Sequence, residues 1–228
     1  MNKLFKKETM RTVAVLIFDN VEVLDFAGPF EVFGVAGGRG NQRLYEVFTV
    51  AQFAGPVMAR NALSVNPHYT FDTMPHADIL VIPGGFGARR QKLCLPVLEF
   101  VRQRAQAAQC VLSVCSGALI LAKAGLLQGL QATTHRGALG ELTLDEPTCT
   151  VWPDARVVDN GKIITSAGIS MGIDASLYLV AKQHGLDAAR ETATYMEYDW
   201  LHQVADGHHI VSRAPDTRIG RPSLPALS

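Results

Sequence analysis

Short apolar runs rich in valine and isoleucine alternate with longer segments of helical period from Arg11 onward. The apolar runs predict buried strands, and they are Thr12–Phe18, Tyr45–Ala51, Asp78–Pro83, Cys110–Val114, Gln131–Thr134, Arg156–Val158 and Lys162–Ser166. The longer segments predict helices, and they are Asp25–Gly34, Pro96–Ala108, Gly117–Leu127, Ile173–His184 and Asp187–Gln203. This alternation is typical of an α/β fold with a doubly wound, mostly parallel sheet and helices on both faces.

Two other segments carry turn signals. Gly55–Ser64 alternates apolar and polar residues, which predicts a strand or hairpin at an edge of the sheet. Asn160-Gly161 lies between the last two predicted strands and is a strong hairpin signal. The chain has no internal repeat, and we expect residues 11–205 to form a single α/β domain between a loose leader (1–10) and an extended C-terminal tail (206–228).

The composition excludes several classes of protein. The 228 residues include 21 Lys+Arg and 21 Asp+Glu, so the field that drives phosphate binding is missing and no nucleic acid partner is expected. No apolar run approaches the roughly 20 residues that cross a bilayer, and the first ten residues lack the apolar region and cleavage site of a signal peptide. We therefore expect a cytoplasmic protein with no membrane partner. The four cysteines form no C-x-x-C pair and are expected to be free thiols.

The segment Ser113–Gly117 places a cysteine between a buried strand and a helix that begins with glycine. This is the arrangement of a nucleophile elbow, in which a sharp turn presents the side chain at the carboxyl edge of the sheet. The N-terminus of the following helix favours thiolate over thiol, so we expect Cys115 to be an accessible nucleophile of low pKa. The alternative is that Cys115 is a small core residue, as free cysteines often are.

A second segment, Ile82–Gly85, ends a neighbouring strand in two glycines. The N–H groups of Gly84 and Gly85, with that of Ser116, are candidate donors for negative charge that develops on a substrate. A plain strand-ending turn is the alternative.

Two titratable residues are candidates for proton transfer. Asp25 follows the first strand, where it is either an N-cap or a carboxyl aimed at Cys115 with a pKa raised by its apolar neighbours. His135 lies at a strand end after the elbow helix and is either structural or a base near Cys115. His208-His209 has no carboxylate or cysteine at ligand spacing, so no metal site is predicted.

Taken in chain order, these motifs resemble the ThiJ/PfpI superfamily and, within it, the isocyanide (isonitrile) hydratases, from about Thr12 to Tyr198. The resemblance rests on Val23–Pro29, Ile82–Gly85, Ser113–Gly117, Gly125–Leu127 with Gly129, Ala132–His135, Gly168–Ile169 and Gly172–Asp174. It implies a flavodoxin-like fold, a homodimer, a small-molecule isocyanide substrate and no cofactor. It further implies that Cys115 attacks the terminal carbon of R–N≡C, that Asp25 moves protons, and that water releases an N-substituted formamide. His135, Gly84 and Ile169 are expected to line the pocket.

Two departures and two alternatives accompany this resemblance. Cys115 is followed by Ser116, whereas the hydratases have threonine at this position; serine keeps the hydroxyl that could hold the sulfur. The proteinase-like branch has histidine at the same position, so its absence here disfavours peptide hydrolysis. AraC-type regulators carry similar sensor domains, so a stand-alone ligand sensor is the main alternative. Glyoxalase- or deglycase-like members, which present a glutamate from the first helix region instead of Asp25, are the other.

Overall fold

The computed structural model describes residues 10–38, 43–200 and 209–210. Its main sheet has eight strands in the order β12-β10-β11-β7-β6-β1-β2-β5. Pairing is parallel from β11 to β5, whereas β10 is antiparallel to both β11 and β12. The strands are β1 (Arg11–Leu16), β2 (Tyr45–Ala51), β5 (Tyr69–Thr70), β6 (Ile79–Ile82), β7 (Cys110–Ser113), β10 (Val157–Asp159), β11 (Ile163–Ser166) and β12 (His209–Ile210).

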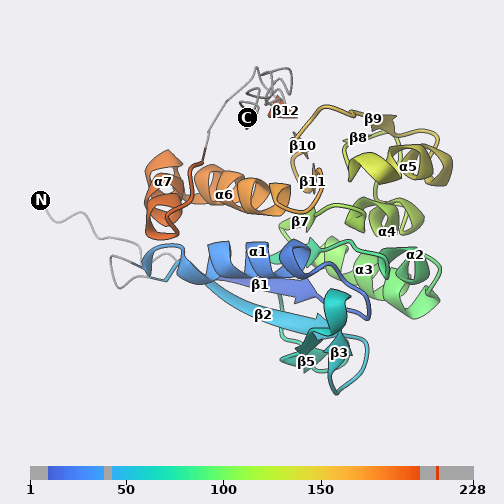
Figure 1. The fold of residues 1–228 in the computed structure, drawn as a ribbon, viewed down its shortest axis with the longest axis horizontal. Helices are drawn as coiled ribbons and strands as arrows, with labels where there is room; N and C mark the ends of the chain where they lie inside the picture. The colour runs from blue at the N-terminus through green and yellow to red at the C-terminus, as the bar shows by residue number, and fades with distance from the viewer. Residues whose placement is uncertain (1–9, 39–42, 201–208, 211–228) are drawn as a thin grey trace, which may run out of the picture.

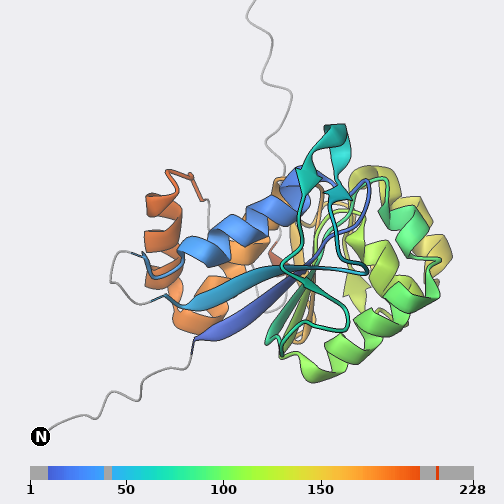
Figure 2. The ribbon, with the colours of Figure 1, turned by 90° about the horizontal axis from the view of Figure 1, so that it is seen from below.

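Helices cover both faces of this sheet, as Figures 1 and 2 show. One face carries α1 (Val23–Val35), α6 (Met171–His184) and α7 (Leu186–Tyr195), and the other carries α2 (Ala88–Gln91), α3 (Leu95–Ala107), α4 (Gly117–Lys123) and α5 (Leu139–Asp145). Every residue of β6 and β7 is buried, because a central parallel strand is covered from above and below. The predicted α/β fold with a doubly wound, mostly parallel sheet is therefore confirmed.

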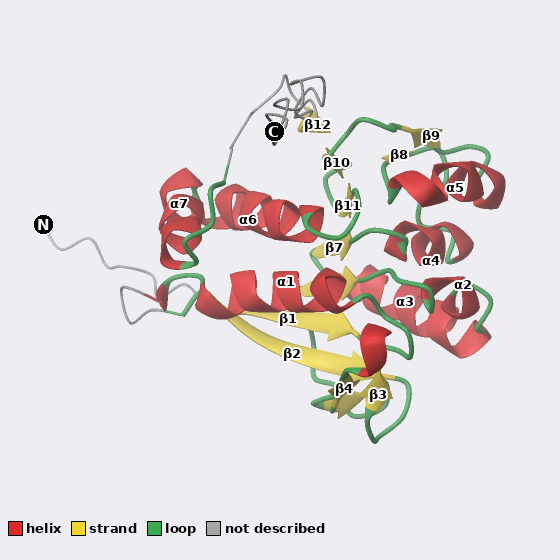
Figure 3. Ribbon diagram, viewed as in Figure 1, coloured by secondary structure: helices red, strands yellow, loops and turns green. Residues whose placement is uncertain are grey.

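Two small sheets stand apart from the main one, and both correct a prediction. The hairpin predicted at Gly55–Ser64 is present as β3 (Val57–Met58) and β4 (Ser64–Val65), but it forms a sheet of its own, and the strand at that edge of the main sheet is β5. Figure 3 shows this hairpin beside the end of β2. Only Gln131–Ala132 of the strand predicted at Gln131–Thr134 is extended (β8), and it pairs with β9 (Thr150–Val151) outside the main sheet. These pieces are too short for a hydrophobic period to separate them from loops.

Several helix ends also differ from prediction. The helix predicted at Gly117–Leu127 ends at Lys123, and Gly125 follows with φ of 73°, the left-handed conformation that ends many helices. The last predicted helix ends at Tyr195 as α7, and its predicted end at Gln203 lies outside the described residues. Residues 1–9 of the predicted leader and most of the predicted tail, including His208, lie outside them as well. Asn160-Gly161 does join two antiparallel strands, with Gly161 at φ of 87°.

A network of charges ties α2 to α4 and α5. The side chain of Lys92, directly after α2, donates to Glu141 over 2.8 Å and also to Asp145 of α5. Arg89 pairs with the same Glu141 over 2.8 Å, and Lys123 of α4 pairs with Asp145 over 3.0 Å. Because the charges are shared among neighbours, the network holds three short helices in a fixed arrangement. Among the described helices, none has the length and apolar character needed to cross a membrane.

Candidate active site

Cys115 occupies the turn between β7 and α4, in the left-handed conformation with φ of 57°. That conformation costs of the order of 1–3 kcal/mol for a residue other than glycine, so the surroundings must enforce it. They do so at the backbone: the N–H of Cys115 donates to the carbonyl of Ala167 over 3.0 Å, and its own carbonyl accepts from the Thr134 hydroxyl over 2.7 Å. A Cβ on Gly117 would lie 2.0 Å from the carbonyl oxygen of Ile82, so only glycine fits after Ser116. The elbow predicted from Ser113–Gly117 is present.

Asp25 lies beside this elbow and is completely buried. Helix α1 begins at Val23, so Asp25 sits in its first turn and Glu22, not Asp25, occupies the N-cap position. The backbone N–H of Gly84 donates to Oδ2 of Asp25 over 3.0 Å. The buried Oδ1 has no partner of full hydrogen-bond geometry, but the carboxyl lies near enough to the Cys115 thiol for their side-chain interaction to shift the pKa of both.

The pKa of Asp25 is raised from 3.8 to about 7. Burial is the largest cause because it disfavours the charged carboxylate, and the negative charge of Glu22 adds to the rise. Hydrogen bonds from Cys115 and from the Gly84 backbone act in the opposite direction. The pKa of Asp25 is raised, as the sequence predicted from its apolar neighbours, although the hydrogen bond from Cys115 reduces the rise.

The expectation of an exposed, low-pKa thiolate at Cys115 is wrong for this structure. Cys115 is 5% exposed, and burial, followed by the charge of Asp25, raises the pKa of its thiol to about 12. Backbone hydrogen bonds from Ile169 and Ser116 to the sulfur lower the pKa, but they do not offset these effects. The resting cysteine is therefore a protonated thiol next to a carboxyl that titrates near neutral pH.

The predicted roles of the two glycine N–H groups also need correction. The N–H of Gly84 is bound to Asp25, and that of Gly85 donates to Oγ of Ser116 over 3.0 Å. The Ser116 hydroxyl donates in turn to the carbonyl of Gly85 over 3.2 Å, so it holds the glycine turn and not the sulfur of Cys115. A Cβ on Gly84 would lie 2.5 Å from the backbone nitrogen of Ser116. The glycines thus allow the two loops to touch and position Asp25, while the N–H groups of Ser116 and Ile169 face the sulfur.

A cavity of about 210 Å³ opens above Cys115. Ile169 lines it, as predicted, and is 37% exposed with φ of 48°, a strained conformation for a β-branched residue. His135 also lines it, as predicted, and its Nδ1 accepts from the N–H of Gly137 over 3.1 Å. Gly84, which was expected in the lining as well, does not contribute to it. The cavity is lined by Glu22, Gly85, Phe86, Arg89, Cys115, Ser116, His135, Gly137, Ala138 and Ile169.

Sequence reasoning missed a charged group at the mouth of this cavity. Glu22 pairs with Arg60 over 3.8 Å, and the Arg60 guanidinium stacks on the ring of Phe86, 4.2 Å from its centre. Arg60 belongs to the β3–β4 hairpin, and two backbone hydrogen bonds hold this hairpin beside Glu22. The N–H of Asn20 donates to the carbonyl of Met58 over 2.7 Å, and the N–H of Arg60 donates to the carbonyl of Val21 over 2.9 Å. Glu22 stands three residues before Asp25 in the sequence, and that spacing was the available signal.

The protein is a doubly wound α/β protein with a cysteine at the centre of its candidate site. The cysteine lies in a left-handed elbow after a central strand, and a buried carboxyl lies beside its thiol. The chain belongs to the DJ-1/PfpI family, whose sequence model matches residues 11–182. Among the residues that the structure describes, no group of three or more histidine, cysteine, aspartate or glutamate side chains is arranged to hold a metal ion.

Individual relatives add detail. The chain is 35% identical over 187 residues to isonitrile hydratase of Pseudomonas putida, which covers 82% of this chain and 78% of that protein. It is 30% identical over 170 residues to the HTH-type transcriptional regulator CdhR of Pseudomonas aeruginosa, covering 75% of this chain but 50% of the regulator. The solved structure of a ThiJ/PfpI family protein from Pseudomonas syringae matches with a TM-score of 0.75 and 31% identity, over 87% of this chain and 79% of that one. These similarities support the assignment of this chain as an isonitrile hydratase-like member of the family.

Proposed function

We propose that the protein is a cofactor-independent isonitrile hydratase, which adds water to R–N≡C and releases the N-substituted formamide. The observation that carries the proposal is the buried pair of Asp25 and Cys115, in which a carboxyl with a pKa of about 7 lies against a protonated thiol. Isocyanide hydration requires a nucleophile and a group that moves protons, and this pair contains both. The 35% identity to the Pseudomonas putida enzyme supports the same reaction.

In the first half-reaction, the Asp25 carboxylate accepts the thiol proton of Cys115 as the sulfur attacks the terminal carbon of the isocyanide. A carbon–sulfur bond forms, and the carbon gains electron density that a proton must neutralise. Asp25 returns the same proton to this carbon, which gives a thioimidate, R–N=CH–S–Cys115. The protein thus needs only one proton between the two side chains. The N–H groups of Ser116 and Ile169 stabilise negative charge on sulfur while the proton is on Asp25.

In the second half-reaction, water attacks the thioimidate carbon while Asp25 takes one of its protons. Asp25 passes that proton to the nitrogen, and the carbon–sulfur bond breaks as the formamide carbonyl forms. The remaining proton of the water reprotonates the sulfur. Oxygen therefore ends on carbon, one hydrogen on nitrogen and one on Cys115, which restores the starting site. His135, at the cavity wall, is the alternative acceptor for the water proton.

Three further parts of the proposal concern the setting of the enzyme. We propose a homodimer in which the apolar early helix around Phe26–Val35 helps to build the interface beside the site. We place the enzyme in the cytoplasm, where its four cysteines would stay reduced. Residues 11–205 are proposed to be one domain.

Incubation of the purified protein with phenyl isocyanide tests the activity directly. We expect N-phenylformamide to accumulate over many turnovers, with Cys115→Ala as the inactive control. In D₂O the formyl carbon should carry deuterium, because the proton on carbon comes from the exchangeable thiol. Binding without any turnover by the wild type would contradict the proposal.

That negative outcome would favour the second candidate, a stand-alone ligand sensor. The similarity to CdhR supports it, since this chain covers about half of that regulator. A sensor would bind a small molecule in the 210 Å³ cavity and release it unchanged. Equilibrium dialysis followed by analysis of the recovered ligand separates the two functions.

A further inference from the structure

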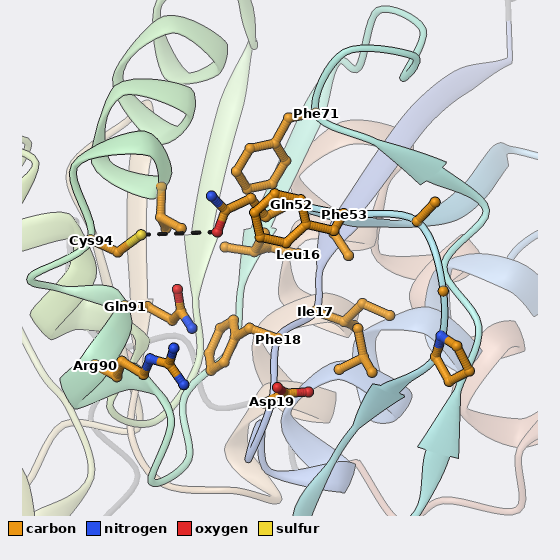
Figure 4. Close-up of a pocket in the computed structure, with 16 residues that line it drawn as sticks. Leu16, Ile17, Phe18, Asp19, Gln52, Phe53, Phe71, Arg90, Gln91 and Cys94 are labelled. Carbon is orange, nitrogen blue, oxygen red and sulfur yellow. Dashed lines mark hydrogen bonds between the residues drawn. The ribbon is translucent and has the colours of Figure 1, made fainter.

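A second cavity, of about 190 Å³, lies where β1 and β2 end and on the side of the sheet that carries α2 and α3 (Figure 4). The carboxyl ends of strands are the usual place for ligands in open α/β sheets. The segments after β1 and β2 form one wall, and α2 with the start of α3 forms the other. The lining residues that matter here are Phe18, Gln52, Phe53, Phe71, Arg90 and Gln91.

The apolar part of this cavity is aromatic. Phe18 is buried, Phe71 is stacked on Phe100 with ring centres 3.8 Å apart, and Phe53 is 71% exposed at the mouth. Figure 4 shows the three lining rings around the gap between the two walls. Flat rings on several sides favour a small ligand with a flat apolar body.

The polar part of the cavity includes one guanidinium and two carboxamides. Arg90 and Gln91 reach from α2 toward Phe18, and Oε1 of Gln52, on the opposite wall, accepts from the Cys94 thiol over 3.9 Å (Figure 4). Arg90 is an exposed residue of this lining, and within the described part of the chain its guanidinium has no ion-pair partner and no side-chain hydrogen bond. Asp19 also lines the cavity, but its Oδ1 already accepts from the N–H of Met58 over 2.9 Å. An unpaired guanidinium flanked by carboxamides is suited to a carboxylate.

This cavity is distinct from the one above Cys115. Helix α2 and the residue after it separate them: Arg89 lines the cavity of Cys115, whereas its neighbours Arg90 and Gln91 line the second cavity. No residue that the structure describes contributes to the lining of both cavities. A ligand in the second cavity would therefore contact neither Cys115 nor Asp25.

We propose that the second cavity binds a small monocarboxylate with a flat apolar body, whose carboxylate pairs with Arg90 while its body packs among Phe18, Phe53 and Phe71. The carboxamides of Gln52 and Gln91 supply further donors to the carboxylate oxygens. The site is independent of the proposed reaction, because the two cavities have separate linings.

Titration of the full-length protein with benzoate, followed by NMR of backbone amides, tests the site. Benzamide and benzylamine serve as neutral and cationic controls of the same shape. We expect saturable shifts at Gln52, Phe53 and Phe71, and at least about tenfold weaker binding of benzamide, because a charged hydrogen-bonded pair contributes about that factor. Arg90→Gln should weaken benzoate binding to a similar extent, while Arg190→Gln, the same change on α7 at the opposite face of the sheet, should not.

A second variant keeps the test decisive if Arg90→Gln perturbs α2. Ala54 lines the cavity at an exposed position, so Ala54→Trp should fill it and abolish benzoate binding. The proposal is overturned if benzoate shifts Ser116 and Ile169 in place of the second cavity, if Arg90→Gln or Ala54→Trp binds as tightly as wild type, or if benzylamine binds as tightly as benzoate. Absence of saturable binding up to about 10 mM also overturns it. None of these measurements depends on isocyanide turnover.

Discussion

The N–H of Gly84 donates to Oδ2 of Asp25 over 3.0 Å and fixes the carboxyl against the elbow that carries Cys115. The two residues are 59 positions apart in the chain. Gly84 has no Cβ, and a Cβ there would lie 2.6 Å from Oγ of Ser116. One small residue therefore brings together the loop after β6, the start of α1 and the elbow.

We predict that Cys115→Ala abolishes formamide production, with a loss of at least about a thousandfold, because the nucleophile is gone. Cys94→Ala and Cys110→Ala are matched controls and should keep most of the activity. Steady-state assays of the three purified variants provide the comparison. If Cys94→Ala were the inactive variant, the nucleophile would lie outside the elbow.

The pH dependence of kcat/KM should follow the Asp25 carboxyl. Below its pKa of about 7 the pair carries two protons, so no base accepts the thiol proton, and kcat/KM should rise as pH increases through that value. Glu22→Gln removes a charge that raises the pKa and should move this rise to lower pH. Arg60→Met leaves Glu22 without its cation and should move it to higher pH. Shifts in the same direction for both variants would contradict this electrostatic account.

Asp25→Asn should fold with its Gly84 hydrogen bond intact but lose turnover by at least about a hundredfold, the low end for general acid–base catalysis. Unchanged turnover would mean that His135 or water, and not Asp25, moves the protons.

The same variant gives a prediction for stability. The folded-state pKa of Asp25 lies above its unfolded value of 3.8, so the native state binds the extra proton and the free energy of unfolding falls as pH rises from about 4 to about 7. Asp25→Asn removes this loss. The difference in unfolding free energy between variant and wild type should therefore grow toward pH 8, by an amount of the order of a few kcal/mol. Urea titrations at pH 5 and pH 8 measure it.

Glycine substitutions should separate close approach from ordinary flexibility. Gly84→Ala places a Cβ 2.5 Å from the backbone nitrogen of Ser116 and should both destabilise the protein and reduce activity. An added Cβ on Gly140, in α5, would meet no described atom within 4 Å apart from its chain neighbours and the backbone of its own helix, so Gly140→Ala should be neutral or stabilising by up to about 1 kcal/mol. Thermal unfolding of both variants compares their stabilities. A Gly84→Ala protein as stable as the wild type would contradict the prediction.

The proposed homodimer has a direct test in solution. Light scattering at micromolar concentration should give twice the mass of one chain. A mass near 24.7 kDa would rule the dimer out.

Local sequence was sufficient to predict which segments meet at the candidate site, because these segments follow strands whose ends share one edge of the sheet. Ser113–Gly117 predicted the elbow since a strand, a cysteine and a glycine-started helix are contiguous. The hydrogen-bond partners of Gly84 and Gly85 depended on loops far apart in sequence, so the sequence could not assign their N–H groups. The pKa of Cys115 was mispredicted for the same reason: burial by distant segments outweighs the local effect of the helix N-terminus. The short strands β3, β4, β8 and β9 have too few residues to show a period.

Helix α2 has only four residues, yet the positions from Arg89 to Lys92, the residue directly after the helix, contact three different parts of the protein. Arg89 lines the cavity above Cys115, Arg90 and Gln91 line the second cavity, and Lys92 pairs with the acidic side chains of α5. A shift or rotation of α2 would therefore change the wall above Cys115, the second cavity and the contacts with α5 at the same time. Insertions or deletions at this outer turn should therefore be tolerated far less well than its partial exposure indicates.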